Sequence, residues 1–259
     1  MKLSLIAATL LFAFVAANAF AEVSDLEKEL ANPFANLTTL PLQYNFYTNT
    51  AKSFETQTVL NIQPVFAAQM SESWTLVNRV IIPTVTSPLA DGADSVSGVS
   101  DLIYQGFYVP NTTGPWTFGF GAMLALPTGA DERISSGKFG AGPAIGIVHT
   151  SEYLSAGGLI YQNWSFAGDD DRKNVNLLTI QPLLSYRLGG GWSFSPLNNI
   201  TYDATLEGEQ WTVPVGVSFT KLLVRKAVPL NLVFGVFGRV VHPDGAPDVE
   251  SKAQMNLVF

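Results

Sequence analysis

The 259-residue sequence contains no cysteine, and only 14% of its residues are charged. Without cysteine there is no disulfide framework, no cysteine-based zinc site, no thiol nucleophile and no lipobox cysteine for an acyl anchor. Soluble domains carry about 25% charged residues, so a chain this poor in charge is typical of a large buried core or a membrane protein. The formal net charge of −7 argues against nucleic acid as a partner, because phosphate binding requires clustered Lys and Arg. The apolar content of 47% excludes intrinsic disorder.

The N-terminus is typical of a secretory signal peptide. Lys2 gives a short positive start, residues 3–17 carry no charge, and Ala19-Phe20-Ala21 supplies a small-x-small cleavage site. We expect residues 1–21 to be removed on export, with a membrane-anchoring helix as the alternative. Beyond them, no uninterrupted apolar run reaches the roughly 18 residues of a spanning helix. An exported, apolar chain without spanning helices indicates strands.

A short helix is predicted over Glu22–Ala31, with Ser24 as its N-cap and Glu27 as the capping-box partner. Asn32-Pro33 ends it. Residues 22–39 therefore form a separate N-terminal segment, expected in the periplasm, and they are a candidate plug or latch.

From Leu40 onward a period of two replaces the helical period. In residues 211–221, for example, large apolar side chains at odd positions alternate with small or polar ones at even positions. Twelve such runs occur, at about 40–48, 54–67, 74–83, 99–110, 116–127, 140–150, 154–166, 175–188, 192–203, 211–222, 230–241 and 249–259. Short connections alternate with longer ones at 84–98, 128–139, 167–174, 204–210 and 242–248.

An even number of strands of about 10 residues, with short turns at one end and long loops at the other, is typical of an outer-membrane barrel. The fold class predicted for residues 40–259 is therefore all-β, an up-and-down antiparallel transmembrane β-barrel of about 12 strands. The alternative is a soluble secreted β-sandwich.

Aromatic residues stand where two interfacial girdles would lie, at opposite ends of the predicted strands. Those beside short turns are Trp74, Trp116 and Trp192, and those beside long loops are Trp164, Phe166 and Trp211. The C-terminal pattern Met255-x-Leu257-x-Phe259 resembles the signal read by the barrel-assembly machinery. The expected partners are that machinery, outer-membrane lipid and lipopolysaccharide.

Polar side chains in the inward phase are the candidate pore lining. They are Gln43, Asn45, Asn61, Gln63, Arg79, Gln105, Asn163, Gln181, Arg239, Lys252, Gln254 and Asn256. Arg79 depends on strand phase, because its strand also fits the opposite phase with Asn78 inward. Two interpretations stay open: a hydrogen-bonding pore with an electrostatic constriction at Arg79 and Arg239, or amides that solvate a closed interior.

Catalytic and metal-binding patterns are weak. Neither a G-x-S-x-G elbow nor an H-E-x-x-H motif occurs, and His242 beside Asp244 is the one candidate base pair. Asp169-Asp170-Asp171 lacks the alternating ligand spacing of a calcium loop. We expect no enzyme activity, no cofactor and no metal site.

Several stretches, in order along the chain, carry a family resemblance. They are Asn32-Pro33-Phe34-Ala35-Asn36-Leu37, Leu60-Asn61-Ile62-Gln63-Pro64-Val65, Asn78-Arg79 through Pro83, Gly137-Lys138-Phe139-Gly140-Ala141-Gly142-Pro143, Ala167-Gly168-Asp169-Asp170-Asp171-Arg172, Trp211-Thr212-Val213-Pro214 and Pro243-Asp244-Gly245-Ala246-Pro247-Asp248. Together they resemble the Gram-negative outer-membrane barrels of the "MetA-pathway of phenol degradation" transporter-like family. The resemblance implies an outer-membrane barrel for uptake of small apolar or aromatic compounds, and no catalytic residues.

The function expected from the sequence is passive passage of small solutes through an outer-membrane channel or transporter. The alternative is a non-conducting barrel with a structural or surface-interaction role.

Overall fold

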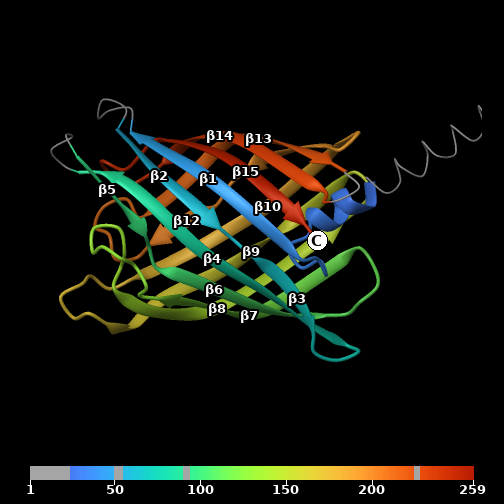
Figure 1. Ribbon diagram of the computed structural model, residues 1–259, viewed down its shortest axis with the longest axis horizontal. Coiled ribbons are helices and arrows are strands. Elements are labelled where there is room, and N and C mark those ends of the chain that lie inside the picture. Colours follow the sequence, from blue (N-terminus) through green and yellow to red (C-terminus); the bar gives the residue numbers. More distant parts are fainter. Residues whose placement is uncertain (1–23, 50–54, 90–93, 225–227) are drawn as a thin grey trace, which may run out of the picture.

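The computed structural model describes residues 24–49, 55–89, 94–224 and 228–259, and the predicted signal peptide lies outside them. Fifteen strand segments form one closed sheet (Figure 1). They are β1 (Thr39–Asn49), β2 (Glu55–Ile62), β3 (Val65–Gln69), β4 (Trp74–Pro88), β5 (Ser95–Val99), β6 (Leu102–Pro110), β7 (Trp116–Leu126), β8 (Lys138–Thr150), β9 (Leu154–Gly168), β10 (Asn176–Gly189), β11 (Trp192–Leu197), β12 (Ile200–Asp203), β13 (Trp211–Leu223), β14 (Leu230–Val241) and β15 (Val249–Val258).

Each segment pairs antiparallel with its neighbours, and β1 pairs with β15 to close the ring. Three barrel strands consist of two segments each, interrupted at Gln63-Pro64, Ser100-Asp101 and Asn198-Asn199. Both halves of each interrupted strand pair with the same neighbour; β2 and β3, for example, both pair with β4. The predicted fold class is thus confirmed as a closed, up-and-down antiparallel barrel of twelve strands with one short helix.

The predicted bounds of one long loop are wrong by several residues at each end. The loop expected at 84–98 is much shorter, because β4 continues to Pro88 and β5 already begins at Ser95. The two segments pair from Thr84↔Val99 to Pro88↔Ser95. Serine and threonine make up half of this extension, so its residues lack the strongly apolar alternation that marks the other strands. Val85 and Val96 instead bury themselves against Ile134 of the next long loop.

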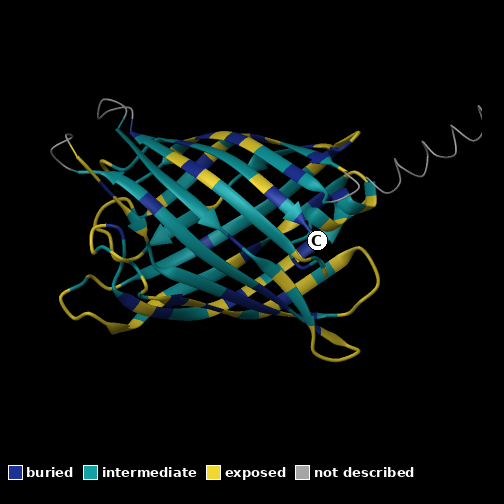
Figure 2. Cartoon of the chain, in the orientation of Figure 1, coloured by how far each residue is buried: buried dark blue, intermediate teal, exposed yellow. Residues whose placement is uncertain are grey.

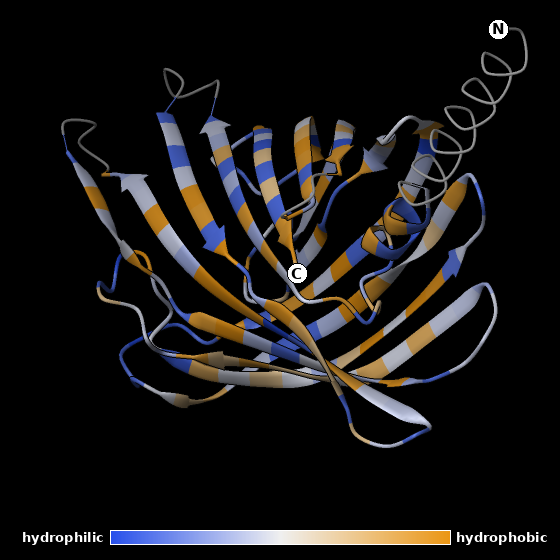
Figure 3. Cartoon of the chain, turned by 45° about the vertical axis from the view of Figure 1, so that its right-hand side comes forward, coloured by the Kyte–Doolittle hydropathy of each residue, from blue (hydrophilic) through white to orange (hydrophobic). Residues whose placement is uncertain are grey.

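The alternating pattern of the sequence becomes an apolar outer face. Phe118, Phe120, Ile145 and Ile147 are exposed on neighbouring strands. Figure 2 shows exposed residues alternating with less exposed ones along several strands, and Figure 3 shows apolar and polar residues alternating along the wall. The aromatic residues predicted as girdles are also exposed at strand ends: Trp116 is 55% exposed and Phe166 is 70% exposed. A band of exposed aliphatic side chains between two aromatic rims is the exterior of a transmembrane barrel.

The described part of the helix covers residues 24–30, and the start predicted at Glu22 lies outside the described residues. Among the described residues, no helix is long and apolar enough to cross a membrane. The helix lies beside the C-terminus at one end of the barrel, opposite the long loops (Figure 1). The N-terminal segment therefore lies at the end of the barrel that carries the short turns.

Candidate functional site: the barrel lumen

The N-terminal segment enters the barrel and packs against its inner wall. Phe34 is 4% exposed and joins an apolar cluster whose other buried members come from four strands, β4, β6, β8 and β9. Its ring meets that of Phe107 edge to face, with the centroids 5.4 Å apart. Nearby, Asn32 Nδ2 donates a hydrogen bond to Thr117 Oγ1 at 3.1 Å. The other buried members of the cluster are Val77, Val109, Ala144, Val148 and Leu159.

Two inward-facing glycines make room for Phe34. A Cβ added at Gly119 would lie 2.7 Å from Phe34 Cε1, and one added at Gly146 would lie 2.7 Å from Phe34 Cζ. Carbon atoms in contact prefer about 3.5–4.0 Å, so neither methyl group fits while the ring is in place. The glycine-rich inner face of β7 and β8 is therefore the seat of this ring.

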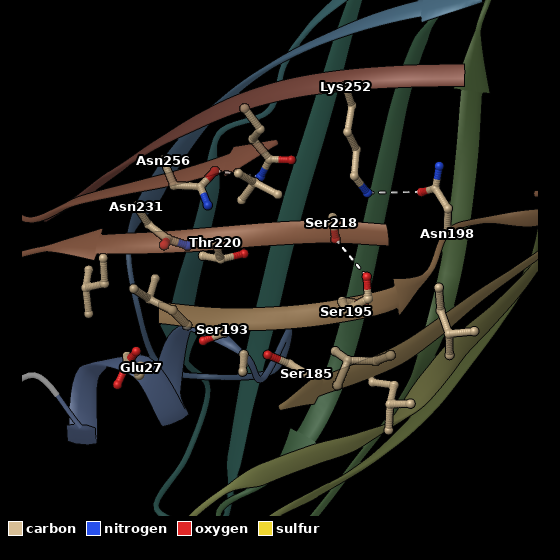
Figure 4. Close-up of a pocket in the computed structure, with 18 of the residues that line it drawn as sticks. Glu27, Ser185, Ser193, Ser195, Asn198, Ser218, Thr220, Asn231, Lys252 and Asn256 are labelled. Atoms are coloured by element: carbon tan, nitrogen blue, oxygen red, sulfur yellow. Dashed lines mark hydrogen bonds between the residues drawn. The ribbon is translucent and has the colours of Figure 1, made fainter. Parts of the chain in front are cut away.

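Beyond the helix lies a small polar cavity of about 240 Å³. Glu27 borders it together with hydroxyl groups of β10, β11 and β13 (Figure 4). The carboxylate is buried, and its Oε1 has no hydrogen-bond partner among the described residues. Burial raises the pKa of the Glu27 carboxyl, and the nearby positive charges of Arg187 and Lys221 offset only part of this shift.

Arg187 is held in place by the adjacent turn. Its guanidinium donates to the carbonyl of Glu152 at 2.8 Å, to Ser155 Oγ at 3.0 Å and to the carbonyl of Ser151. The positive charge that faces the helix is therefore fixed by the barrel wall and does not depend on the N-terminal segment.

A larger cavity of about 490 Å³ occupies the centre of the lumen. On one side it is bordered by the N-terminal segment, from Glu29 to Leu37. Many of the predicted pore-lining candidates also border it, among them Gln43, Asn61, Gln63, Arg79, Gln105, Gln181 and Arg239. Asn45, Lys252, Gln254 and Asn256 do so as well. That these side chains contact a permeating solute stays a prediction.

The structure determines the positions of two further candidates, Asn163 and Arg79. Asn163 is not among the residues bordering the cavity; its Oδ1 is buried, without a partner in the described chain, on the side where Gly140 leaves space. Arg79 borders the cavity, whereas Asn78 accepts a hydrogen bond from Tyr104 Oη at 2.7 Å on the other face of the sheet. The phase with Arg79 inward is the one that the barrel adopts.

A chain of amide side chains runs along the inner wall from Arg79. Its Nε donates to Gln63 Oε1 at 3.1 Å, Gln63 Nε2 donates to Gln43 Oε1 at 3.2 Å, and Gln43 Nε2 donates to Asn45 Oδ1 at 2.8 Å. In the other direction, Arg79 Nη1 lies 3.5 Å from Gln105 Oε1. All hydrogen bonds of this chain therefore point away from the guanidinium.

The second predicted cation, Arg239, is compensated. Its Nη2 lies 3.5 Å from Glu250 Oε2, and the guanidinium stacks 4.6 Å from the ring centroid of Tyr47. Asn198 donates to Glu250 Oε1 at 2.8 Å and accepts from Lys252 Nζ at 3.1 Å. The two arginines thus differ: Arg239 has a carboxylate partner, and Arg79 has none among the described residues.

Sequence reasoning missed where the N-terminal segment docks on the wall. The residues concerned are Phe34, Gly119, Gly146 and Glu27, and none was a candidate. The available signal was the pair of inward-phase glycines, which leave space in a strand face, but their partner lies in a segment without strand periodicity.

The candidate base pair of His242 and Asp244 is not joined by a hydrogen bond in the structure. His242 Nδ1 lies 3.0 Å from the carbonyl of Pro243, the next residue, and no hydrogen bond joins it to Asp244. In the described ranges there is no group of three or more side chains that could hold a metal ion.

Fold and site together define the class: a twelve-stranded, outer-membrane-type β-barrel whose lumen holds its own N-terminal segment and a polar cavity. The sequence profile of the family described as MetA-pathway of phenol degradation matches residues 32–219, and the chain belongs to that family.

Solved structures share the fold. The COG4313 outer membrane channel from Pseudomonas putida F1 is 17% identical, with a TM-score of 0.61 over 86% of this chain and 96% of that chain. The NanC porin is 10% identical, with a TM-score of 0.53 over 86% of this chain and 98% of that chain. At these identities the likeness concerns the fold alone. A search of the curated proteins found no match.

Proposed function

We propose that this protein is an outer-membrane channel for passive passage of small solutes, and that its N-terminal segment closes the periplasmic half of the lumen. One observation carries the proposal: the cavity of about 490 Å³ inside the closed barrel is bordered by polar side chains of the wall on one side and by residues 29–37 on the other. A segment that is not part of the wall separates this cavity from the periplasmic mouth.

The exterior supports the location. Exposed aromatic residues at both strand ends and an aliphatic band between them match a bilayer, and the wall satisfies its own backbone hydrogen bonds. Twelve strands lie between eight, where side chains fill the interior, and sixteen, where a wide aqueous channel opens. Small solutes, including the apolar or aromatic compounds that the family resemblance implies, fit this size.

The contacts of the segment support a reversible closure. Its side-chain contacts with the wall include the packing of the Phe34 ring and a hydrogen bond from Asn32, and the Glu27 carboxylate lies near the positive charges of Arg187 and Lys221. None of these contacts belongs to the sheet, so withdrawal of the segment leaves every described wall pairing intact.

The experiment is planar-bilayer recording of the refolded mature barrel and of a variant lacking residues 22–36. Heat-shifted gel mobility verifies that both are folded. We expect rare or small current steps for the full chain and larger, sustained steps for the deletion. Equal conductance in both would remove the closing role of the segment.

A non-conducting barrel is the competing proposal, and one observation favours it. The cluster around Phe34 fills the lumen between β4 and β9 with apolar side chains. If correctly folded wild-type and deletion barrels are both impermeable to ions and small solutes, the structural role replaces the channel.

A further inference from the structure

Arg79 is a cation inside the barrel that lacks a carboxylate partner. Among the described residues, four ion pairs occur, Lys28–Asp25, Arg133–Asp131, Arg172–Glu132 and Arg239–Glu250, and Arg79 belongs to none of them. Among the described residues, its guanidinium donates hydrogen bonds to the amide oxygens of Gln63 and Gln105 and to no carboxylate. Arg79 is half-buried, and a largely desolvated charge without a counter-charge is costly, so its presence beside a cavity indicates a group that binds there.

The surrounding amides do not supply negative charge. Each turns its oxygen toward Arg79 and its N–H group away from it. A guanidinium has five N–H groups, and the contacts to Gln63 and Gln105 use three of them. Because Gln105 turns its oxygen toward Arg79, its Nε2 is left without a partner in the described structure although the side chain is fully buried. The far end of the chain, Asn45 Nδ2, is buried and unpartnered in the same way.

The unmet groups at this wall are thus all N–H donors. An unpaired buried donor costs free energy until an acceptor reaches it, and charged acceptors gain most. One unpaired amide oxygen, Gln181 Oε1, also belongs to a residue that borders the cavity, but it is on β10 and not on the strands around Arg79. The sign of the site at Arg79 is therefore unambiguous: it takes an anion.

The wall on either side of Arg79 selects the rest of the ligand. Val77 and Ile81 flank it on β4, Ile103 and Phe107 flank Gln105 on β6, and Tyr161 faces the same cavity from β9. These side chains are apolar or aromatic. A volume of about 490 Å³ lies within the range of small-molecule sites.

We propose that Arg79 and Gln105 bind the carboxylate of a small organic acid whose apolar or aromatic body lies against this part of the wall. The proposal rests on the proposed function, since the acid must enter the lumen. A carboxylate matches two free N–H groups of one guanidinium fork, with Gln105 Nε2 as a third donor.

The test is isothermal titration of the folded barrel in detergent with sodium benzoate, blank micelles being subtracted. Benzyl alcohol, which has the same ring and no charge, is the matched ligand. Arg79→Gln removes the cation, and Lys252→Gln is the matched control, because it removes another cation of the same cavity outside the Arg79 chain.

We expect benzoate to bind the wild type at least tenfold more tightly than benzyl alcohol. Arg79→Gln should weaken the binding of benzoate at least tenfold and change the binding of benzyl alcohol by no more than about twofold. Lys252→Gln should change the affinity for benzoate by about twofold or less. Arg79→Lys keeps the charge but loses the planar guanidinium fork, so its affinity for benzoate should lie between those of the wild type and Arg79→Gln. It replaces Arg79→Gln in the test if that variant does not fold.

Equal losses in Arg79→Gln and Lys252→Gln would overturn the site, because general lumen charge would then explain the binding. Benzoate that fails to bind a barrel that conducts ions would also overturn it and leave the channel standing. Benzoate binding to a barrel that never conducts would instead refute the proposed function and keep the site.

Discussion

Adding one methyl group at Gly119 should open the barrel. The new Cβ would lie 2.7 Å from Phe34 Cε1 and 3.0 Å from Phe34 Cζ. The ring cannot move away from β7 freely, since Gly146 on β8 leaves no more room than Gly119 does. Gly119→Ala therefore strains only the state in which the segment is docked; with the segment withdrawn, the methyl group projects into open lumen.

The size of the effect follows from overpacking. Inserting a methyl group into a packed site costs about 1–3 kcal/mol, which is about 5- to 150-fold in the docking equilibrium. In planar-bilayer recordings we expect the open probability of Gly119→Ala to rise by a factor within this range, while the conductance of each open step stays the same. Gly238→Ala is the matched control, because a Cβ at that strand glycine meets no atom within 4 Å.

A double-mutant cycle makes the reasoning refutable. Phe34→Ala alone should also raise the open probability, because it removes the ring that anchors the segment. In that background Gly119→Ala should have no further effect, since its clash partner is gone. If Gly119→Ala still raises the open probability by the same factor in Phe34→Ala, the methyl group acts on the wall and the docking account is wrong.

Three further predictions concern other parts of the molecule. The docked state raises the pKa of Glu27, so docking is favoured below the ordinary value of 4.5 and weakens as pH rises through the raised pKa; lowering the pH from 7 to 4 should reduce openings, and Glu27→Gln should show few openings at both pH values. Phe234→Arg, on the outer face at the middle of β14, should lower unfolding free energy in lipid by about 2–4 kcal/mol, whereas Val240→Arg near the strand end should cost about 0–1 kcal/mol. Arg172 ties the loop before β8 through the carbonyls of Glu132, Ser135 and Ser136, so Arg172→Ala should make that loop several-fold faster to cleave by trypsin after Arg133, as followed by mass spectrometry.

Most of the barrel was predictable because its two faces differ in chemistry. The alternation around Trp211 to Lys221, with exposed Val215, Val217 and Phe219 opposite buried Ser218, needs no tertiary information to be recognised. Prediction failed where the apolar alternation weakens: half of the residues in the hairpin of Thr84–Pro88 and Ser95–Val99 are serine or threonine, and its buried face packs on a loop residue, Ile134.

The lumen was predictable as a list of side chains and not as a site. The period of two predicts that Gln43, Gln63 and Gln105 face inward. The hydrogen bonds between these amides depend on which strands are neighbours in the barrel and on the register of β1, β2 and β4, which the sequence pattern does not give. For Arg79, the sequence left two phases open, since Asn78 is equally polar; the hydrogen bond from Tyr104 to Asn78 satisfies the outward amide. Residues 22–39 were predicted as a candidate plug, but the place where they dock was not, because their apolar contact with the wall centres on a single ring, Phe34.

The most direct test of a closing N-terminal segment is to lock and release it in one protein. The cysteine-free chain permits this: Asn32 and Thr117 are joined side chain to side chain, so Asn32→Cys with Thr117→Cys places two thiols at the docking contact, and each single variant is a control. Mass spectrometry verifies the disulfide, and bilayer currents are recorded before and after a reductant is added. We expect the oxidised barrel to be silent and the reduced barrel to open, with the single variants indifferent to reductant. Equal currents from the oxidised and the reduced double variant would contradict the account.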